Sequence, residues 1–295
     1  MDLFVQMVLN GLQIGSVYIL FALGLTLIFG VMKVVNFGHG ALFAIAAYTA
    51  YVILSYGADN FPGVPAWLLY LGSFAVATVL LGLVGVALYY AFFKRFAGDL
   101  ISTLIVTIGF ALVIEVLVRQ TFSAQPRSVP TVVNGRISIL GASVTLERVM
   151  IFMVAIAVTI AVAAFVRSTT TGMALRAVTS DAEAATLQGI SVTRIALVGV
   201  LLATTLAAVA GVLIAPATVV TPTMGFEFLM KGFVIIILGG LGSLTGAIYG
   251  GLIVGMAESV GTQMFDLTTA TIFTFCVVIV VLLFRPQGLM GHAEL

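Results

Sequence analysis

The side chains best suited to specific interactions lie between residues 168 and 194, the most polar stretch in the second half of the sequence. Ser180 followed by Glu183 matches a capping box, in which each side chain satisfies a backbone donor at the start of a helix. Gly189 fits the end of that helix, because glycine adopts the left-handed conformation at little cost. Reversing a chain takes only about two to eight residues, so an ordered segment of this length predicts a docking site for another protein. An amphipathic loop on a membrane surface is the alternative.

No set of catalytic or metal-ligating residues accompanies this segment. The single cysteine, Cys276, lies in an apolar run, which excludes an intramolecular disulfide and a thiolate metal cluster. His39 and His292 are too few for a histidine metal centre. The sequence also has no HExxH, GxSxG or GxxxxGK[ST] motif. We therefore expect no catalytic residue, no metal site and no nucleotide bound by this chain.

A second polar group interrupts the first apolar run at residues 33–40. Gly38 and Gly40 bracket His39, so a helix is weak there, and Asn36 and His39 add hydrogen-bond donors and acceptors. A helix broken at membrane depth persists only where its freed backbone groups face protein or a water-filled cavity. A tight turn at the membrane surface is the alternative.

Glycines also interrupt the apolar run at residues 228–260. Gly242, Gly246 and Gly250 recur every four residues, a spacing that lets another helix approach closely. Two glycine-interrupted segments, one in each half of a transporter, indicate a translocation site between the halves; simple helix packing is the alternative. The candidate pathway residues are Asn36, Gly38, His39, Gly40, Gly239, Gly240, Gly242 and Ser243.

Charged side chains are rare within the apolar runs. Glu115 and Arg119 are one helical turn apart and are expected to pair near a membrane surface. Glu258 is also expected at an interface. Lys231 is expected to extend towards the membrane surface, with a substrate carboxylate as its alternative partner. Because the centres of the runs are nearly free of charge, a proton relay is not expected.

The composition explains why so few residues are polar. The chain of 295 residues is 62% hydrophobic and 8% charged, with a mean hydropathy of +1.27. Soluble domains carry about 25% charged residues, so the bilayer must act as solvent for most of this chain. The formal net charge of +1 provides no basic surface for nucleic acid.

The lengths of the apolar runs predict helices that cross the membrane. A crossing helix needs about 20 mainly apolar residues, and the runs lack the alternation of barrel strands. We predict an all-α polytopic bundle of about eight transmembrane segments, with broken, glycine-rich helices, as a single domain over residues 1–295. The run at 228–260 could consist of two half-helices. The runs are 4–32, 41–56, 67–93, 100–118, 149–166, 195–220, 228–260 and 268–284.

Basic residues predict the orientation, because short cytoplasmic loops carry an excess of Lys and Arg. Placing the 168–194 loop inside puts seven basic residues inside and five outside. The amino terminus is then outside and the carboxyl terminus in the cytoplasm. The inside set is Lys33, Lys94, Arg95, Arg167, Arg176, Arg194 and Arg285; the outside set is Arg119, Arg127, Arg136, Arg148 and Lys231.

The outside connection, residues 121–147, carries a hairpin signal. Asn134-Gly135 separates the β-prone stretches 131–133 and 136–139, which favours a type I′ turn between two strands. Such a hairpin would form a rigid ledge on which another protein could dock. A structureless loop is the alternative.

The 168–194 segment resembles the EAA loop of ABC importer permeases, in the pattern Glu183-Ala184-Ala185 followed by Gly189. Over residues 172–190 it is similar to branched-chain amino acid permeases of the LivH family. Three other segments resemble that family in order along the chain: Val-Asn-Phe-Gly-His-Gly at 35–40, the glycine-rich stretch 239–251, and Arg-Pro-Gln-Gly-Leu at 285–289. The Leu-Pro that follows the loop glycine in many other importers is absent, which favours this subfamily.

The resemblance implies a permease subunit of a binding-protein-dependent importer in the bacterial inner membrane. It implies branched-chain or other hydrophobic amino acids as substrate; urea or short amides are the alternative, and a stand-alone channel for a small neutral solute is a further one. The implied partners are a second related permease, two ATPase subunits that bind ATP and Mg, and an extracytoplasmic solute-binding protein. The residues implied to contact an ATPase are Arg176, Ser180, Asp181, Glu183, Ala184, Ala185, Gly189 and Ile190.

Overall fold

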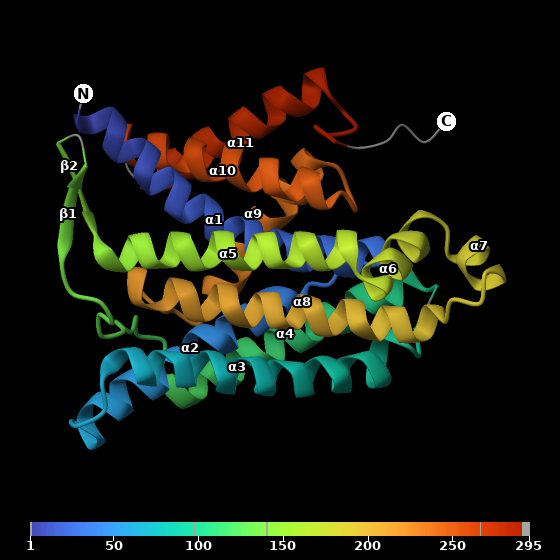
Figure 1. The fold of residues 1–295 in the computed structure, drawn as a ribbon, viewed down its shortest axis with the longest axis horizontal. Coiled ribbons are helices and arrows are strands. Elements are labelled where there is room, and N and C mark those ends of the chain that lie inside the picture. Colours follow the sequence, from blue (N-terminus) through green and yellow to red (C-terminus); the bar gives the residue numbers. More distant parts are fainter. Residues whose placement is uncertain (1, 97, 140, 266, 291–295) are drawn as a thin grey trace.

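The structure is a computed structural model that describes residues 2–96, 98–139, 141–265 and 267–290. These residues form eleven α-helices and one β-hairpin (Figure 1). A π-helical turn (Tyr89–Phe93) extends α3, and a 3-10 turn (Ala215–Ala217) extends α8. The helices are α1 (Asp2–Met32), α2 (Gly38–Asn60), α3 (Ala66–Leu88), α4 (Leu100–Phe122), α5 (Leu146–Ser168), α6 (Thr170–Ser180), α7 (Ala182–Leu187), α8 (Val192–Ile214), α9 (Met224–Gly239), α10 (Leu244–Met264) and α11 (Leu267–Phe284); the strands are β1 (Arg136–Ile139) and β2 (Ala142–Thr145).

The helices confirm the all-α membrane architecture. Among the described residues, seven helices are long and apolar enough to cross a bilayer: α1, α2, α3 with its π-helical turn, α4, α5, α8 and α10. Two shorter apolar helices, α9 and α11, bring the number of apolar helices to nine, compared with about eight predicted segments. The glycine-interrupted run at 228–260 is divided between two helices, which the turn Gly240–Ser243 joins.

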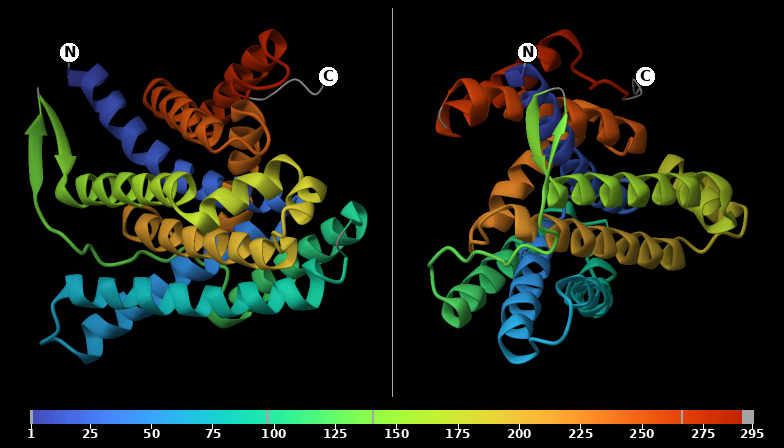
Figure 2. Two further views of the ribbon diagram at one scale, coloured as in Figure 1. Left: turned by 45° about the vertical axis from the view of Figure 1, so that its right-hand side comes forward. Right: turned by 60° about the vertical axis from the view of Figure 1, so that its left-hand side comes forward.

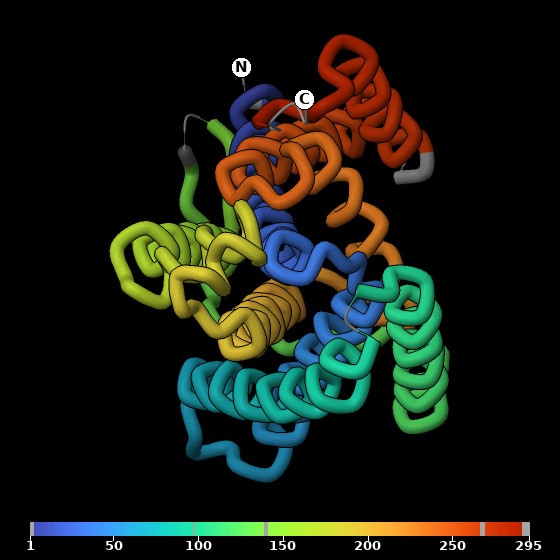
Figure 3. The backbone as a smooth tube through the Cα atoms, turned by 90° about the vertical axis from the view of Figure 1, so that its right-hand side faces the viewer, coloured from blue at the N-terminus to red at the C-terminus, as the bar shows by residue number. Residues whose placement is uncertain are grey.

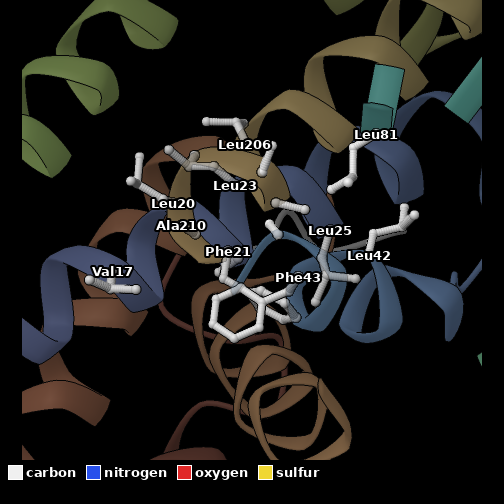
Figure 4. Packing of buried hydrophobic residues seen from close by; sticks show 14 of the residues in the cluster. Val17, Leu20, Phe21, Leu23, Leu25, Leu42, Phe43, Leu81, Leu206 and Ala210 are labelled. Atoms are coloured by element: carbon white, nitrogen blue, oxygen red, sulfur yellow. The ribbon is translucent and has the colours of Figure 1, made fainter. Parts of the chain in front are cut away.

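The first helix occupies the middle of the bundle. Figure 3 shows α1 surrounded by the other helices, and its middle section from Val17 to Leu25 is almost completely buried. Around Phe21 it packs against α2 and α8, with Phe43 and Leu206 among the contacting side chains (Figure 4). By contrast, α4 and α5 expose large apolar side chains such as Ile105 and Ile160. This distribution is expected when the outer helices face lipid and the central helix faces only protein.

The molecule has two distinct ends. The helix α7 projects from one end, and the hairpin β1–β2 lies at the other, near the amino terminus (Figures 1 and 2). We name these the α7 end and the hairpin end. At the α7 end, Lys33 donates a hydrogen bond from Nζ to the carbonyl oxygen of Thr179 at 3.2 Å. At the hairpin end, Arg148 donates from its guanidinium to Asn10 Oδ1 at 2.7 Å.

The hairpin exists, and the predicted β-prone stretch 136–139 is confirmed as a strand, but it is the first strand of the hairpin and not the second. Strand β1 pairs antiparallel with β2, and Ile137 lies opposite Val144. Strand β1 ends at Ile139 and β2 begins at Ala142, so the predicted turn at Asn134-Gly135 is wrong; residue 140 lies outside the described residues. Asn134 and Gly135 lie at the open end of the hairpin: the N–H of Leu146 donates to the carbonyl of Gly135 at 3.0 Å, and Thr131 Oγ1 donates to Asn134 Oδ1 at 3.0 Å.

The break after α1 is shorter than predicted. It covers residues 33–37, and Lys33 has a positive φ of 54°. Gly38, His39 and Gly40 already belong to the first turn of α2. Asn36 stabilises this start because its Oδ1 accepts a hydrogen bond from the backbone N–H of Gly38 at 3.0 Å.

Candidate functional site

The helix α7 is capped at its start by Asp181, one residue after the predicted Ser180. Asp181 has an extended backbone, and its Oδ1 accepts hydrogen bonds from the N–H groups of Glu183 and Ala184, both at 2.9 Å. Ser180 is the last residue of α6 and therefore cannot cap the next helix. The predicted cap is thus wrong in position, although a capped helix does form. The negative charge of Asp181 also interacts favourably with the positive end of the helix dipole.

The predicted end of α7 at Gly189 is confirmed. Gly189 has a φ of 80°, a left-handed conformation that strains other residues. Its N–H donates to the carbonyl of Thr186 at 2.9 Å, and the N–H of Ile190 donates to the carbonyl of Ala185 at 3.1 Å. These two bonds form a Schellman motif. Both ends of this short helix are therefore fixed by hydrogen bonds.

Most of α7 faces away from the rest of the molecule. Ala185 is buried and Ile190 is half-buried, so these two residues anchor the helix. Glu183 and Ala184 are exposed, and the side chain of Leu187 is 87% exposed. A large apolar side chain on a rigid projection is typical of a surface that another protein covers. The arrangement can therefore transmit force from a bound partner.

The helix α6 connects α7 rigidly to the bundle. Thr169 caps α6, since its Oγ1 accepts from the N–H of Gly172 at 3.0 Å and donates to the carbonyl of Phe165 at 2.7 Å. Gly172 lies so close to α5 that an added Cβ would overlap the backbone of Val166. Arg176 reaches back to the carbonyl of Arg167 at 3.5 Å. Movement of α7 would therefore carry α5 and α6 with it.

The candidate pathway residues near the start of α2 are tightly packed. Asn36 and His39 are buried, and the ring of His39 lies edge-on to Phe21 with ring centroids 4.8 Å apart. Gly40 packs directly against Gly225 of α9, where an added Cβ would overlap the carbonyl oxygen. These residues therefore join α1, α2 and α9.

The candidate residues at the end of α9 form a turn at the α7 end. Gly240 and Gly242 have φ values of 100° and 82°, so the turn requires glycine at both positions. Ser243 caps α10, since its Oγ accepts from the N–H of Gly246 at 3.1 Å. The N–H of Leu289 donates to the carbonyl of Leu238 at 2.8 Å, which brings the carboxyl-terminal segment back to this turn.

The structure keeps these two candidate groups apart. Gly40 contacts α9 near its start, at Gly225, whereas Gly239 ends the same helix. Fourteen residues of helix between these two contact points correspond to about 21 Å. Each group instead has its own cavity. Gly40 lines an apolar cavity of about 90 Å³ between α2, α4 and α9, and Gly242 and Ser243 line a cavity of about 640 Å³ at the α7 end.

A buried charge network connects three helices, and in it Lys231 and Glu258, which were considered separately in the sequence, pair with each other. Lys231 Nζ lies 2.6 Å from Glu258 Oε1 and donates to Tyr18 Oη at 2.8 Å. Tyr18 in turn donates to Glu258 Oε2 at 2.7 Å. The pair joins α9 to α10, and Tyr18 adds α1. The available signal was a pair of opposite charges in neighbouring apolar helices, which tend to pair within membranes.

Two other expectations about charged and metal-binding residues can be compared with the structure. Glu115 and Arg119 pair as predicted, with 2.7 Å between Oε1 and the guanidinium. Within the described ranges, which exclude His292, no group of three or more His, Cys, Asp or Glu residues could hold a metal ion.

Comparison with known proteins places this architecture in a family. Residues 7–282 match the family described as "Branched-chain amino acid transport system / permease component". The chain is 32% identical to the high-affinity branched-chain amino acid transport system permease protein LivH of Escherichia coli K12, over 99% of this chain and 96% of LivH. It is 30% identical to BraD of Pseudomonas aeruginosa, over 99% and 97% of the two chains. No solved structure matches it. The chain therefore belongs to the family of branched-chain amino acid transport permease components.

Proposed function

We propose that α7 is the surface through which an ATPase subunit drives this permease. The observation that carries the proposal is a short helix fixed at both ends by hydrogen bonds, with Leu187 presented at its surface. An ATPase groove that covers Leu187 would remove this apolar side chain from water. The resulting motion would reach α5 through α6. A stand-alone channel has no use for such a device.

The proposed complex contains a second related permease, two ATPase subunits that bind ATP and Mg, and an extracytoplasmic solute-binding protein. The proposed contact set is Arg176, Ser180, Asp181, Glu183, Ala184 and Gly189 together with Leu187, whereas Ala185 and Ile190, which were also expected to contact the ATPase, hold α7 in place from beneath. The names of the relatives and the apolar cavity beside Gly40 support branched-chain or other hydrophobic amino acids as substrate.

The proposed orientation in the inner membrane places the α7 end in the cytoplasm and the amino terminus outside. Lys33, Arg167 and Arg176 line one cavity at the α7 end, in agreement with the excess of basic residues in cytoplasmic loops. The hairpin then faces outwards, where a solute-binding protein approaches.

The substitution Leu187→Asp tests the docking surface. It should reduce ATPase co-purification and ATP-driven leucine uptake at least 10-fold, because a carboxylate would be buried in an apolar contact. Ile137→Asp introduces the same charge into an exposed apolar position on the hairpin and should leave ATPase co-purification unchanged. If the unaltered chain retains no ATPase, or if Leu187→Asp retains it fully, the proposal fails. Competition by leucine but not by urea or acetamide supports the substrate assignment.

A further inference from the structure

The cavity at the α7 end combines positive charge from two helices and from the segment that follows α1. It has a volume of about 640 Å³ and lies between α1, α5, α6 and α10. Lys33 directly follows α1, Arg167 belongs to α5 and Arg176 to α6. Of the described residues that line it, none is Asp or Glu. A solute in this cavity therefore meets cations without competing carboxylates, which favours an anion.

A buried hydroxyl group beside the same cavity has no hydrogen-bond partner among the described residues. Thr26 of α1 lines the cavity, its side chain is 2% exposed, and its Oγ1 has no hydrogen-bond partner within the described part of the chain. A buried hydroxyl without a partner is destabilising, so a ligand that accepts its proton would remove this destabilisation. Ser180 and Thr245 provide two more hydroxyl groups on the lining.

The start of α10 also opens onto the cavity. Gly242, Ser243, Leu244 and Thr245 are lining residues, and Ser243 is the N-cap of α10. The first N–H groups of a helix have no partner within the helix and carry the positive end of its dipole. Such a terminus stabilises bound phosphate.

The remaining lining is apolar and indicates a ligand with both a charged and an apolar part. Leu27, Val166, Leu175 and Ile248 belong to this part of the wall. Basic pockets between transmembrane helices on the cytoplasmic side bind phospholipid headgroups in other membrane proteins. We propose that this cavity is a binding site for a phosphate-bearing anion, with the headgroup of an anionic phospholipid as the source that its amphipathic lining favours.

An occupant of this site would connect the helices that carry the docking surface. Lys33 already reaches the carbonyl of Thr179 in α6. A phosphate that contacts Lys33, Arg167 and Arg176 together would connect α1, α5 and α6 by charge. An occupied site would join these helices beneath α7, and its occupation does not depend on which solute the permease carries.

Native mass spectrometry of the full-length purified chain can test the site with two lipids. Phosphatidylglycerol should bind more tightly than phosphatidylcholine. The double variant Lys33→Gln with Arg167→Gln should bind phosphatidylglycerol roughly 10- to 30-fold more weakly, as expected from the loss of two cations near a lipid headgroup. The matched control is Lys94→Gln with Arg95→Gln, which removes two exposed cations outside the cavity; its binding should be unchanged.

The substitution Thr26→Val provides a second test, because valine has nearly the same shape as threonine and lacks the hydroxyl. It should weaken binding severalfold without lowering the unfolding temperature. Inorganic phosphate then distinguishes the sources: displacement of the lipid by millimolar phosphate indicates a soluble phosphate ligand, and no displacement indicates the lipid. Equal loss of binding in the cavity and control double variants, or equal binding of the two lipids, would overturn the proposal.

Discussion

Individual side chains in the core of this permease are positioned by a charge pair that spans neighbouring helices. The side chains of Lys231 and Glu258 are 22% and 10% exposed, and Tyr18 bonds to both. A lone charge that is buried to this extent destabilises the fold, whereas a charge that is paired and hydrogen-bonded is tolerated. The pair therefore fixes the positions of α9 and α10 against α1.

We expect Glu258→Gln to lower the free energy of unfolding by about 3 kcal/mol, because Lys231 is left without its counter-charge. Combining it with Lys231→Met should recover most of the loss, since no lone charge remains. Thermal unfolding of the purified chain in detergent measures both effects. Equal destabilisation of the single and double variants would show that the charge pair does not position these helices.

At the scale of the helices, α9 is held by glycine on two sides. Gly225 contacts Gly40 of α2, and Gly239 contacts Gly246 of α10, in each case backbone against backbone. Contacts this close let the helices approach further than larger residues permit. Glycine at these positions therefore serves helix packing, which was one of the two interpretations of the glycine spacing.

The substitution Gly239→Ala should destabilise the bundle by about 1–3 kcal/mol, because the new methyl group overlaps Gly246. Gly109→Ala in α4 is the matched control, since an added Cβ there meets no atom within 4 Å. Unfolding temperatures of the two variants give the comparison. A variant at Gly239 that keeps its stability but loses transport would instead assign that glycine to the pathway.

The sequence predicted the existence of these elements better than their ends. Apolar run length identified every long helix, because a bilayer imposes a minimum length on each crossing segment. The positions at which the helices and strands begin and end depended on single hydrogen bonds. Asp181 rather than Ser180 caps α7 because α6 extends to Ser180, and propensity alone does not decide between adjacent capping residues. The hairpin turn lies later in the chain than predicted. Hydrogen bonds that involve the side chains of Thr131 and Glu147 hold the segment 131–133, which was expected to be a strand.

At the scale of the whole molecule, the distribution of exposed apolar residues separates a lipid-facing exterior from a protein core. The central helix α1 is almost entirely enclosed, whereas α3, α4 and α5 expose apolar faces. The α7 end carries the projecting helix α7 and the basic cavity, and the hairpin end carries the only strands in the described ranges. This difference between the two ends predicts that the α7 end faces the cytoplasm.

Cysteine labelling tests that orientation. Cys276 is the only natural cysteine, so Cys276→Ser provides a background without thiols. In intact cells, a membrane-impermeant maleimide should label the Ile137→Cys variant but label Lys94→Cys, an exposed position outside the docking surface, only after permeabilisation, because the inner side is closed to the reagent. Labelling in the opposite pattern would reverse the assignment.

The sequence by itself determined the membrane environment, the helical class, the family resemblance and the glycine that ends α7. Each of these depends on composition or on residues close together in the chain. Only the tertiary structure decided the pairing of Lys231 with Glu258, the separation of Gly40 from Gly239 and the basic cavity beneath α7. These features bring together residues from helices far apart in sequence, and their geometry depends on how the helices pack around α1. Packing of this kind is set by side-chain shape and close backbone contact, which a hydropathy pattern does not contain.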